Sequence, residues 1–218
     1  MKNQYFTLLL IGLLTGFNLY SQQIIDDPDA IPSQKGDYIK DNRINEYIGT
    51  WEWKNENETL TIVIEKRKLK ANLGTDFYVY KDMALGWYKY VKNGVIIDNN
   101  LEQQNIKLNT FNDAHEHASL FGGSNKNDIS FTFQDFKSNK KYRVIMKLSP
   151  NKQEVSWIVY SYNSTVALKD KIKQKKKSGN IKLELVGVAE NVSVTQNKSQ
   201  LDEDTFYLPV DVTLKKVK

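Results

Sequence analysis

Three short runs of alternating apolar and polar residues constrain the fold of this chain more than any other feature. In each run, at 129–133, 142–148 and 155–159, the apolar residues recur at every second position, which is the period of a β-strand with one buried face. The segments between the runs, Lys137–Lys140 and Ser149–Lys152, are each about four residues long. Connections this short join antiparallel neighbours, because a parallel pair needs a crossover of a dozen or more residues. The sequence therefore predicts an antiparallel meander.

Further runs along the chain bring the total to about nine predicted strands. They are rich in Val, Ile, Tyr, Phe and Trp, residues that fit the half-buried surface of a sheet. Such a series of short strands is typical of an all-β barrel or a β-sandwich, which present the same alternation. The remaining predicted strands are 59–66, 77–81, 85–91, 95–97, 181–188 and 206–214.

Local signals between the strands predict turns and interruptions. Asn55–Glu58 and Lys92-Asn93-Gly94 read as hairpin turns, the second because Asn-Gly accepts positive φ at both central positions. Gly122–Asn125 reads as a flexible turn. Pro209 has no N–H to donate, so it predicts an edge position or a bulge near the start of the last strand. A short helical turn is expected over about Asp41–Tyr47.

The start of the chain has the order of a secretory signal peptide. Lys2 precedes a short apolar run, Phe6–Leu14, and small and polar residues follow up to Ser21. We expect cleavage after Ser21 and a secreted or periplasmic protein, with no integral membrane span in the mature chain, because no later apolar stretch approaches the roughly 20 residues required. The predicted organisation is a signal peptide (1–21), an irregular N-terminal arm (22–48) and a single antiparallel β domain (49–218).

Composition excludes several chemistries. The chain has no cysteine, so disulfides, zinc–thiolate sites, iron–sulfur clusters and thiol nucleophiles are ruled out. The net charge of +5 is modest, and nucleic acid is not an expected partner of an exported protein with this charge. Much of the excess lies in Lys169–Lys177, which reads as a solvated loop or as a patch for an anionic polysaccharide or a membrane surface.

Gly49-Thr50-Trp51, just before the first good strand, resembles the G-x-W motif that opens lipocalin-type barrels. In that family the Gly frees the backbone at the barrel entrance and the Trp plugs the closed end as a structural residue. The resemblance favours a lipocalin-like barrel over a sandwich. Trp53 would lie on the same face as Trp51, and two core tryptophans in an ordinary strand are the alternative interpretation.

A broader resemblance rests on four segments spread over the mature chain. These segments are Tyr47–Lys54, Thr59–Ile62, Tyr88–Gly94 and Leu208–Leu214. Together they resemble an uncharacterised family of small exported proteins from Bacteroidetes-type bacteria, a domain of unknown function. The resemblance implies export and a β fold, and it implies no activity.

An aromatic-rich region supplies the candidate ligand-binding residues. Tyr78 and Tyr80 form one i, i+2 pair and Tyr88 and Tyr90 form another, on two predicted neighbouring strands, and Trp87 has the opposite parity to Tyr88 and Tyr90. One face could stack on a sugar or another flat ligand. The alternative is that one aromatic row fills the core and the other covers the sheet, since Tyr and Trp combine an apolar body with a polar tip.

The chain has only two histidines, His115 and His117. On a strand they would share a face about 7 Å apart, with Asp113 of the same parity, a spacing that can chelate a metal. On a helix they would diverge, and a surface loop is the favoured interpretation, so no metal site or cofactor is assigned. No catalytic residue is assigned either, because the chain has no signature of a nucleophile elbow or a phosphate-binding loop.

The sequence favours an exported, non-enzymatic binding protein that holds a small apolar or amphipathic ligand in a β-barrel, since a barrel of about eight strands can enclose one such ligand. The alternative is a secreted or surface interaction module that recognises a glycan or a protein through aromatic residues. A hydrolase is the second alternative, because catalytic carboxylates leave little trace in a sequence. The ligand and the oligomeric state stay open.

Overall fold

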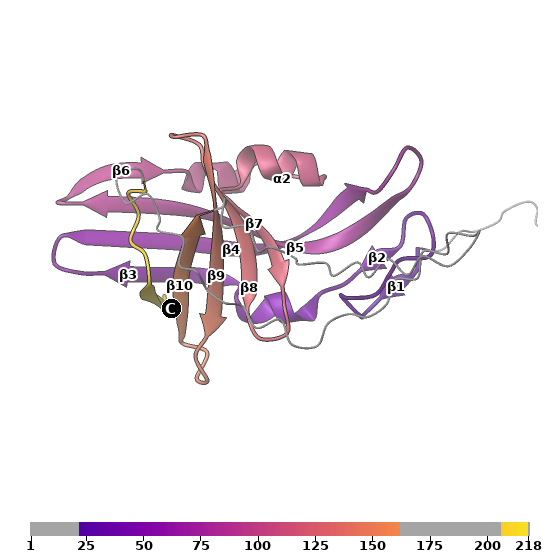
Figure 1. Cartoon of the computed structure of the whole chain (residues 1–218), viewed down its shortest axis with the longest axis horizontal. Helices are drawn as coiled ribbons and strands as arrows, with labels where there is room; N and C mark the ends of the chain where they lie inside the picture. Colours follow the sequence, from indigo (N-terminus) through magenta and orange to yellow (C-terminus); the bar gives the residue numbers. More distant parts are fainter. Residues whose placement is uncertain (1–21, 162–205, 218) are drawn as a thin grey trace, which may run out of the picture.

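The chain forms a closed antiparallel β-barrel of eight strands with additional strands outside it (Figure 1). The computed structural model describes residues 22–161 and 206–217. The order around the barrel is β5-β4-β3-β11-β10-β9-β8-β7, and pairing of β7 with β5 closes it. The all-β prediction is confirmed, and the architecture is the barrel. The barrel strands are β3 (Gly49–Lys54), β4 (Glu58–Asn72), β5 (Tyr78–Lys92), β7 (Leu120–Ser124), β8 (Ile129–Asp135), β9 (Lys140–Leu148), β10 (Glu154–Ser161) and β11 (Val212–Lys216).

The predicted meander and hairpins are present. β8, β9 and β10 pair in sequence order and antiparallel, with Phe131 opposite Val144 and Val144 opposite Val159. β3 and β4 form a hairpin, and β5 turns into β6 (Val95–Asn99) through Asn93 and Gly94, whose φ values are 52° and 76°. Both values are positive, as the Asn-Gly signal predicts.

Small residues make the seam that closes the barrel. β5 meets β7 with Ala84 opposite Gly122 and Gly86 opposite Leu120. A Cβ atom on Gly122 would lie 2.0 Å from the backbone oxygen of Ser130, so the neighbouring strand leaves no room for a side chain. The prediction of a turn over Gly122–Asn125 is therefore wrong, because β7 runs to Ser124 and Gly122 marks a close approach of two backbones within the sheet.

The break predicted between residues 81 and 85 is absent, because the strand continues through a buried aspartate. Segments 77–81 and 85–91 were predicted as two strands, yet β5 runs unbroken and pairs with β4 along its whole length. Asp82 interrupts the apolar pattern, but it is only 2% exposed and its carboxylate accepts hydrogen bonds within the fold.

The last strand starts later than predicted. The strand expected over 206–214 is β11, which begins at Val212, and the preceding segment is irregular. Pro209 cannot donate to a ladder and Asp211 has a φ of 52°, so neither favours a strand. Phe206 and Leu208 are nevertheless buried, and the indole of Trp157 donates to the carbonyl of Pro209 at 3.0 Å.

Three predicted features lie outside the described residues. They are the leader (1–21), the lysine-rich segment (169–177) and the strand expected over 181–188. Within the described ranges, no helix is long and apolar enough to cross a membrane.

The N-terminal arm packs against one end of the barrel. β1 (Ile24–Ile25) pairs parallel with β2 (Tyr38–Ile39), which pairs parallel with β5. The predicted helical turn is η1 (Asn42–Glu46), a 3-10 helix capped by Asp41. It brings Tyr47 over the barrel end, where the Tyr47 carbonyl accepts a 2.8 Å hydrogen bond from the indole of Trp51.

The barrel interior is filled by side chains, many of them aromatic. A second cluster lies outside the barrel, where η2 (Leu101–Asn105) and α2 (Phe111–His117) cover the outer face of β4 and β5 around Leu69, Leu85 and Trp87. The larger interior side chains are Trp51, Leu60, Ile62, Ile64, Tyr88, Tyr90, Phe131, Phe133, Tyr142, Met146, Trp157 and Phe206.

Candidate functional site: a tyrosine–lysine face beside the barrel

One face of the β4–β5 hairpin changes from apolar to polar along its length. Leu60 and Ile62 of β4 point into the barrel opposite Tyr90 and Tyr88 of β5. Because strand side chains alternate, the same face continues along β4 at every second residue. Figure 1 shows the hairpin running past β8, β9 and β10 toward β1 and β2. Beyond the barrel, the face therefore leaves the core and carries lysine.

Three tyrosines lie on this projecting face. Tyr80 on β5 stands opposite Lys70 on β4 and is paired on its other side with Tyr38 of β2. Tyr78 packs against Tyr80 edge to face, with ring centroids 5.8 Å apart. All three tyrosines are half-buried. We name this surface the tyrosine–lysine face, and it consists of Tyr38, Tyr78, Tyr80, Lys35, Lys68 and Lys70.

The lysines of the face lie on the tyrosine rings. The ammonium nitrogen of Lys68 is 4.1 Å from the ring centroid of Tyr38 and 4.8 Å from that of Tyr80. The corresponding distances to Tyr78 are 4.2 Å for Lys70 and 5.5 Å for Lys35. These separations are in the range of cation–π attraction, which holds an ammonium group near a ring without neutralising its charge.

A buried carboxylate anchors the N-terminal arm at the base of the face. Asp82 accepts hydrogen bonds from the Tyr38 hydroxyl at 2.7 Å and from the backbone N–H of Asp41 at 3.1 Å. The ammonium group of Lys66 lies 3.5 Å from the same carboxylate. Burial and the hydrogen bond to Asp82 raise the pKa of Tyr38 to about 12, because both favour the neutral phenol.

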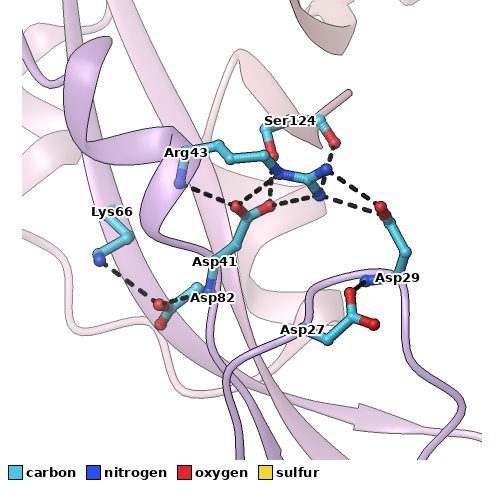
Figure 2. A network of polar contacts seen from close by, with 7 residues as sticks. All are labelled: Asp27, Asp29, Asp41, Arg43, Lys66, Asp82 and Ser124. Carbon is cyan, nitrogen blue, oxygen red and sulfur yellow. Dashed lines mark hydrogen bonds and ion pairs between the residues drawn. The ribbon is translucent and has the colours of Figure 1, made fainter. Parts of the chain in front are cut away.

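Figure 2 shows how Arg43 continues this network. Its guanidinium contacts Asp29 at 3.1 Å and Asp41 at 3.1 Å, and it also reaches the backbone oxygen of Ser124 at the end of β7. The hydrogen bonds that Arg43 donates to Asp29 and Asp41 raise the pKa of Arg43, and the bond from Arg43 lowers the pKa of Asp29. The network ties the arm to both strands that form the barrel seam.

The five predicted ligand-binding residues share β5 but occupy three environments. Tyr78 and Tyr80 belong to the tyrosine–lysine face. Tyr88 and Tyr90 point into the barrel and are each 2% exposed. Trp87 is fully buried on the outer side, where its indole donates to the carbonyl of His117 at 2.9 Å. The expected core row and covering row therefore do not simply correspond to the two faces of the strand. Tyr88 and Tyr90 lie in the core, whereas Tyr78 and Tyr80, which have the same parity, lie on the part of β5 beyond the barrel.

Sequence reasoning missed four residues of this face, namely Lys35, Tyr38, Lys68 and Lys70. The lysines at 66, 68 and 70 share the parity of a strand face, which was a usable signal. Tyr38 had no such signal, because its place is set by the parallel pairing of β2 with β5.

A polar cluster lies on the barrel half of the same hairpin. The Tyr88 hydroxyl donates to Asp98 at 2.6 Å and lies 2.8 Å from the hydroxyl of Tyr207, which also donates to Asp98. Burial, assisted by the hydrogen bond to Asp98, raises the pKa of both tyrosines. Burial and nearby Glu58 raise the pKa of Tyr90 to about 12. The cluster joins β5, β6 and the segment before β11.

The two histidines lie on helix α2, so the favoured surface loop is wrong and the strand geometry that a metal site would require is absent. Asp113, the proposed third ligand, accepts hydrogen bonds from the backbone N–H groups of Asn109 and Thr110 as part of the helix cap. His115 packs on Phe121 with ring centroids 4.1 Å apart, and partial desolvation lowers its pKa. Among the described residues, no group of three or more His, Asp or Glu side chains is placed to hold a metal ion.

The buried carboxylates of the described residues are engaged in structural hydrogen bonds. Asp37 accepts from the backbone of Ser33 and Gln34, and Asp135 accepts from the turn that follows β8. Asp41 and Asp82 belong to the network already described. These partners hold turns and strand junctions in place, so the geometry lends no support to the hydrolase alternative.

These features define a class: a closed antiparallel barrel in which one hairpin, β4–β5, projects beyond the barrel and pairs with the N-terminal arm. Within that class, the chain belongs to a family of unknown function, DUF6705, which matches residues 1–217. This match confirms the predicted resemblance to an uncharacterised domain family. No curated protein and no solved structure matches the chain significantly. The lipocalin resemblance therefore rests on the barrel and on the Gly49-Thr50-Trp51 motif alone.

Proposed function

We propose that this protein is an exported, non-enzymatic binding module for glycans, and that the tyrosine–lysine face is its binding surface. The observation that carries the proposal is the row of Tyr38, Tyr80 and Tyr78 on a sheet face that projects beyond the barrel. Aromatic side chains with polar tips suit carbohydrate, because a sugar presents both apolar C–H faces and hydroxyl groups. Export rests on the leader, Lys2 to Ser21.

The barrel interior is a less suitable place for a ligand. Trp51, Trp157, Phe131 and Phe133 are each at most 1% exposed and pack in one continuous cluster. A ligand held inside would have to displace this cluster, whereas the projecting face needs no such rearrangement. This difference favours the interaction-module alternative over the apolar-ligand carrier.

The proposal is tested by glycan binding to variants of the face. The protein as its host exports it is screened on an array of neutral and acidic glycans, and the best ligand is titrated by calorimetry. Tyr78→Ala and Tyr80→Ala are expected to weaken binding about tenfold or more, which corresponds to about 1.4 kcal/mol. Tyr160→Ala is the matched control, because Tyr160 is a half-buried tyrosine on β10, away from the face.

Three outcomes would contradict the proposal. One is that no glycan binds, and another is that the two face variants bind as well as the wild type. The third is that native mass spectrometry finds an apolar molecule that organic extraction removes, which would return the function to the barrel interior. Thermal melting of each variant shows whether a loss of binding reflects loss of the fold.

A further inference from the structure

We infer that the glycan bound by the tyrosine–lysine face is acidic, with carboxylate or sulfate groups along a linear chain. This inference rests on the proposed function and adds the chemical class of its ligand. It comes from the lysines of the face, whereas the proposed function comes from its tyrosines.

Three lysine side chains lie on one face of the projecting hairpin. Lys68 and Lys70 are two residues apart on β4, so their side chains leave the same face about 7 Å from each other. Lys35 reaches the same face from the loop before β2 and lies on the ring of Tyr78. The three ammonium groups therefore lie along the projecting part of the β4–β5 hairpin, Lys68 over Tyr38 and Tyr80, and Lys35 and Lys70 over Tyr78. A linear polyanion that follows the hairpin would contact these ammonium groups along its length.

The charges of these three lysines are not neutralised within the described part of the chain. There, Lys35, Lys68 and Lys70 form no ion pair with a carboxylate, and Lys68 donates instead to the amide oxygen of Gln22 at 2.8 Å. Two neighbouring lysines differ: Lys66 pairs with Asp82 and Lys40 pairs with Asp26. The three ammonium groups therefore lie beside the tyrosines without a carboxylate in ion-pair contact, and such charges favour an anionic partner.

The tyrosine rings restrict the lysine side chains before a ligand binds. A lysine side chain that is immobilised by a ligand loses rotamer freedom, which opposes binding. Contact with Tyr38, Tyr80 and Tyr78 has already restricted Lys68 and Lys70 in the free protein. The ammonium groups keep their charge while part of this entropy is lost before the ligand arrives.

The geometry favours a polysaccharide over an anionic membrane. The lysine ammonium groups lie along the side of the projecting hairpin, whereas a membrane would engage the tip of that hairpin. The exposed apolar side chains of this region are single residues, Ile24 on β1 and Ile31 and Leu73 on separate loops, and scattered apolar residues of this kind are normal on a soluble surface. Vesicle binding is therefore an outcome that would contradict the inference.

The test compares polymers that differ only in charge. The exported protein is titrated with dextran and dextran sulfate, with hydroxyethylcellulose and carboxymethylcellulose, and with vesicles of phosphatidylglycerol. We expect the charged member of each pair to bind at least about tenfold more tightly at low salt, with the difference reduced at 0.5 M salt because ions screen exposed charges. The double variant Lys68→Gln/Lys70→Gln is expected to lose about tenfold in affinity for the charged polymers.

Lys140→Gln/Lys147→Gln is the charge-matched control, because both lysines are exposed on β9, and it is expected to bind within about twofold of the wild type. An equal loss in this control would overturn the inference, because net charge alone would then explain the binding. Tighter binding to the vesicles than to either charged polymer would also overturn it.

The inference and the proposed function fail in different ways. If neutral and charged polymers bind equally and only the tyrosine variants lose affinity, the glycan module stands and the acidic ligand is wrong. If no polymer binds, the proposed function itself is wrong, and the inference falls with it.

Discussion

The hydroxyl of Tyr38 donates a 2.7 Å hydrogen bond to the buried carboxylate of Asp82. Tyr38 belongs to the N-terminal arm and Asp82 to the middle of β5, so this bond joins two parts of the chain that are distant in sequence. Asp82 also accepts from the backbone N–H of Asp41, which starts the 3-10 helix at the barrel end. One carboxylate thus places Tyr38 on the tyrosine–lysine face and fixes the entry of the chain into the barrel.

Removal of this carboxylate should therefore destabilise the protein. In Asp82→Ala the Tyr38 hydroxyl and the Asp41 N–H lose their acceptor, and we expect a loss of about 2–3 kcal/mol in the free energy of unfolding by urea. The control is Asp26→Ala, which removes the exposed Asp26–Lys40 pair and should change stability by at most about 0.5 kcal/mol. A loss in Asp82→Ala no larger than in the control would show that Asp82 is not the anchor.

The same bond predicts a loss of stability at alkaline pH. The pKa of Tyr38 is raised to about 12 in the folded protein, above the ordinary value of 10, so the folded state keeps a proton that the unfolded state releases. The stabilisation is complete below pH 10 and is lost as the pH rises from 10 to 12. Urea midpoints measured from pH 8 upward should fall less steeply for Tyr38→Phe than for the wild type. Equal slopes would show that this phenol does not titrate as described.

The sequence predicted the barrel wall well because its signals are local. Alternation in β8, β9 and β10, the Asn-Gly turn and the helical turn near Asp41 depend only on neighbouring residues. The closure of β5 on β7 and the parallel pairing of β2 with β5 depend on contacts between distant segments, and no local pattern specifies them. Gly122 was misread as a turn for this reason, since its lack of a side chain serves the strand that packs beside it.

The candidate site was only half predictable because parity does not reveal where a barrel ends. Tyr78, Tyr80, Tyr88 and Tyr90 alternate in the same phase along β5. The last two fall within the barrel and are buried, whereas the first two lie on the projecting part. The apolar-to-lysine change along β4, from Ile64 to Lys66, is the sequence signal that marks this boundary.

The barrel seam should not tolerate a side chain at Gly122. In Gly122→Ala the new Cβ would lie 2.0 Å from the backbone oxygen of Ser130, and a backbone atom cannot move aside as the end of a side chain can. We expect a loss of about 3 kcal/mol or more, or failure to fold. Gly123→Ala is the neighbouring control, because its Cβ would meet nothing within 4 Å, and it should be neutral within about 1 kcal/mol. Thermal melting and the yield of soluble protein measure both, and similar behaviour of the two variants would refute this account of the seam.

The glycine of the Gly49-Thr50-Trp51 motif should be required for its backbone conformation. Gly49 has a φ of 130°, and a Cβ there would lie 3.2 Å from the Cε atom of Lys216, whose flexible side chain can move. The expected loss of about 1–3 kcal/mol in Gly49→Ala therefore comes mainly from the backbone. Gly74→Ala, at the open hairpin tip, should be close to neutral. If Gly49→Ala unfolds at the wild-type urea concentration, the motif does not need a glycine here.

Two tyrosines near the same end of the barrel should respond oppositely to loss of their hydroxyl groups. The Tyr88 hydroxyl donates to Asp98, so Tyr88→Phe removes a hydrogen bond from a half-buried carboxylate and should cost about 1–3 kcal/mol. The Tyr142 hydroxyl is buried and has no hydrogen-bond partner among the described residues. Tyr142→Phe removes a polar group that gains nothing in the core, and it should leave stability unchanged or raise it by about 1 kcal/mol. Urea denaturation of the two variants measures the contrast, and a clear loss in Tyr142→Phe would mean that its hydroxyl is satisfied, as a buried water molecule could do.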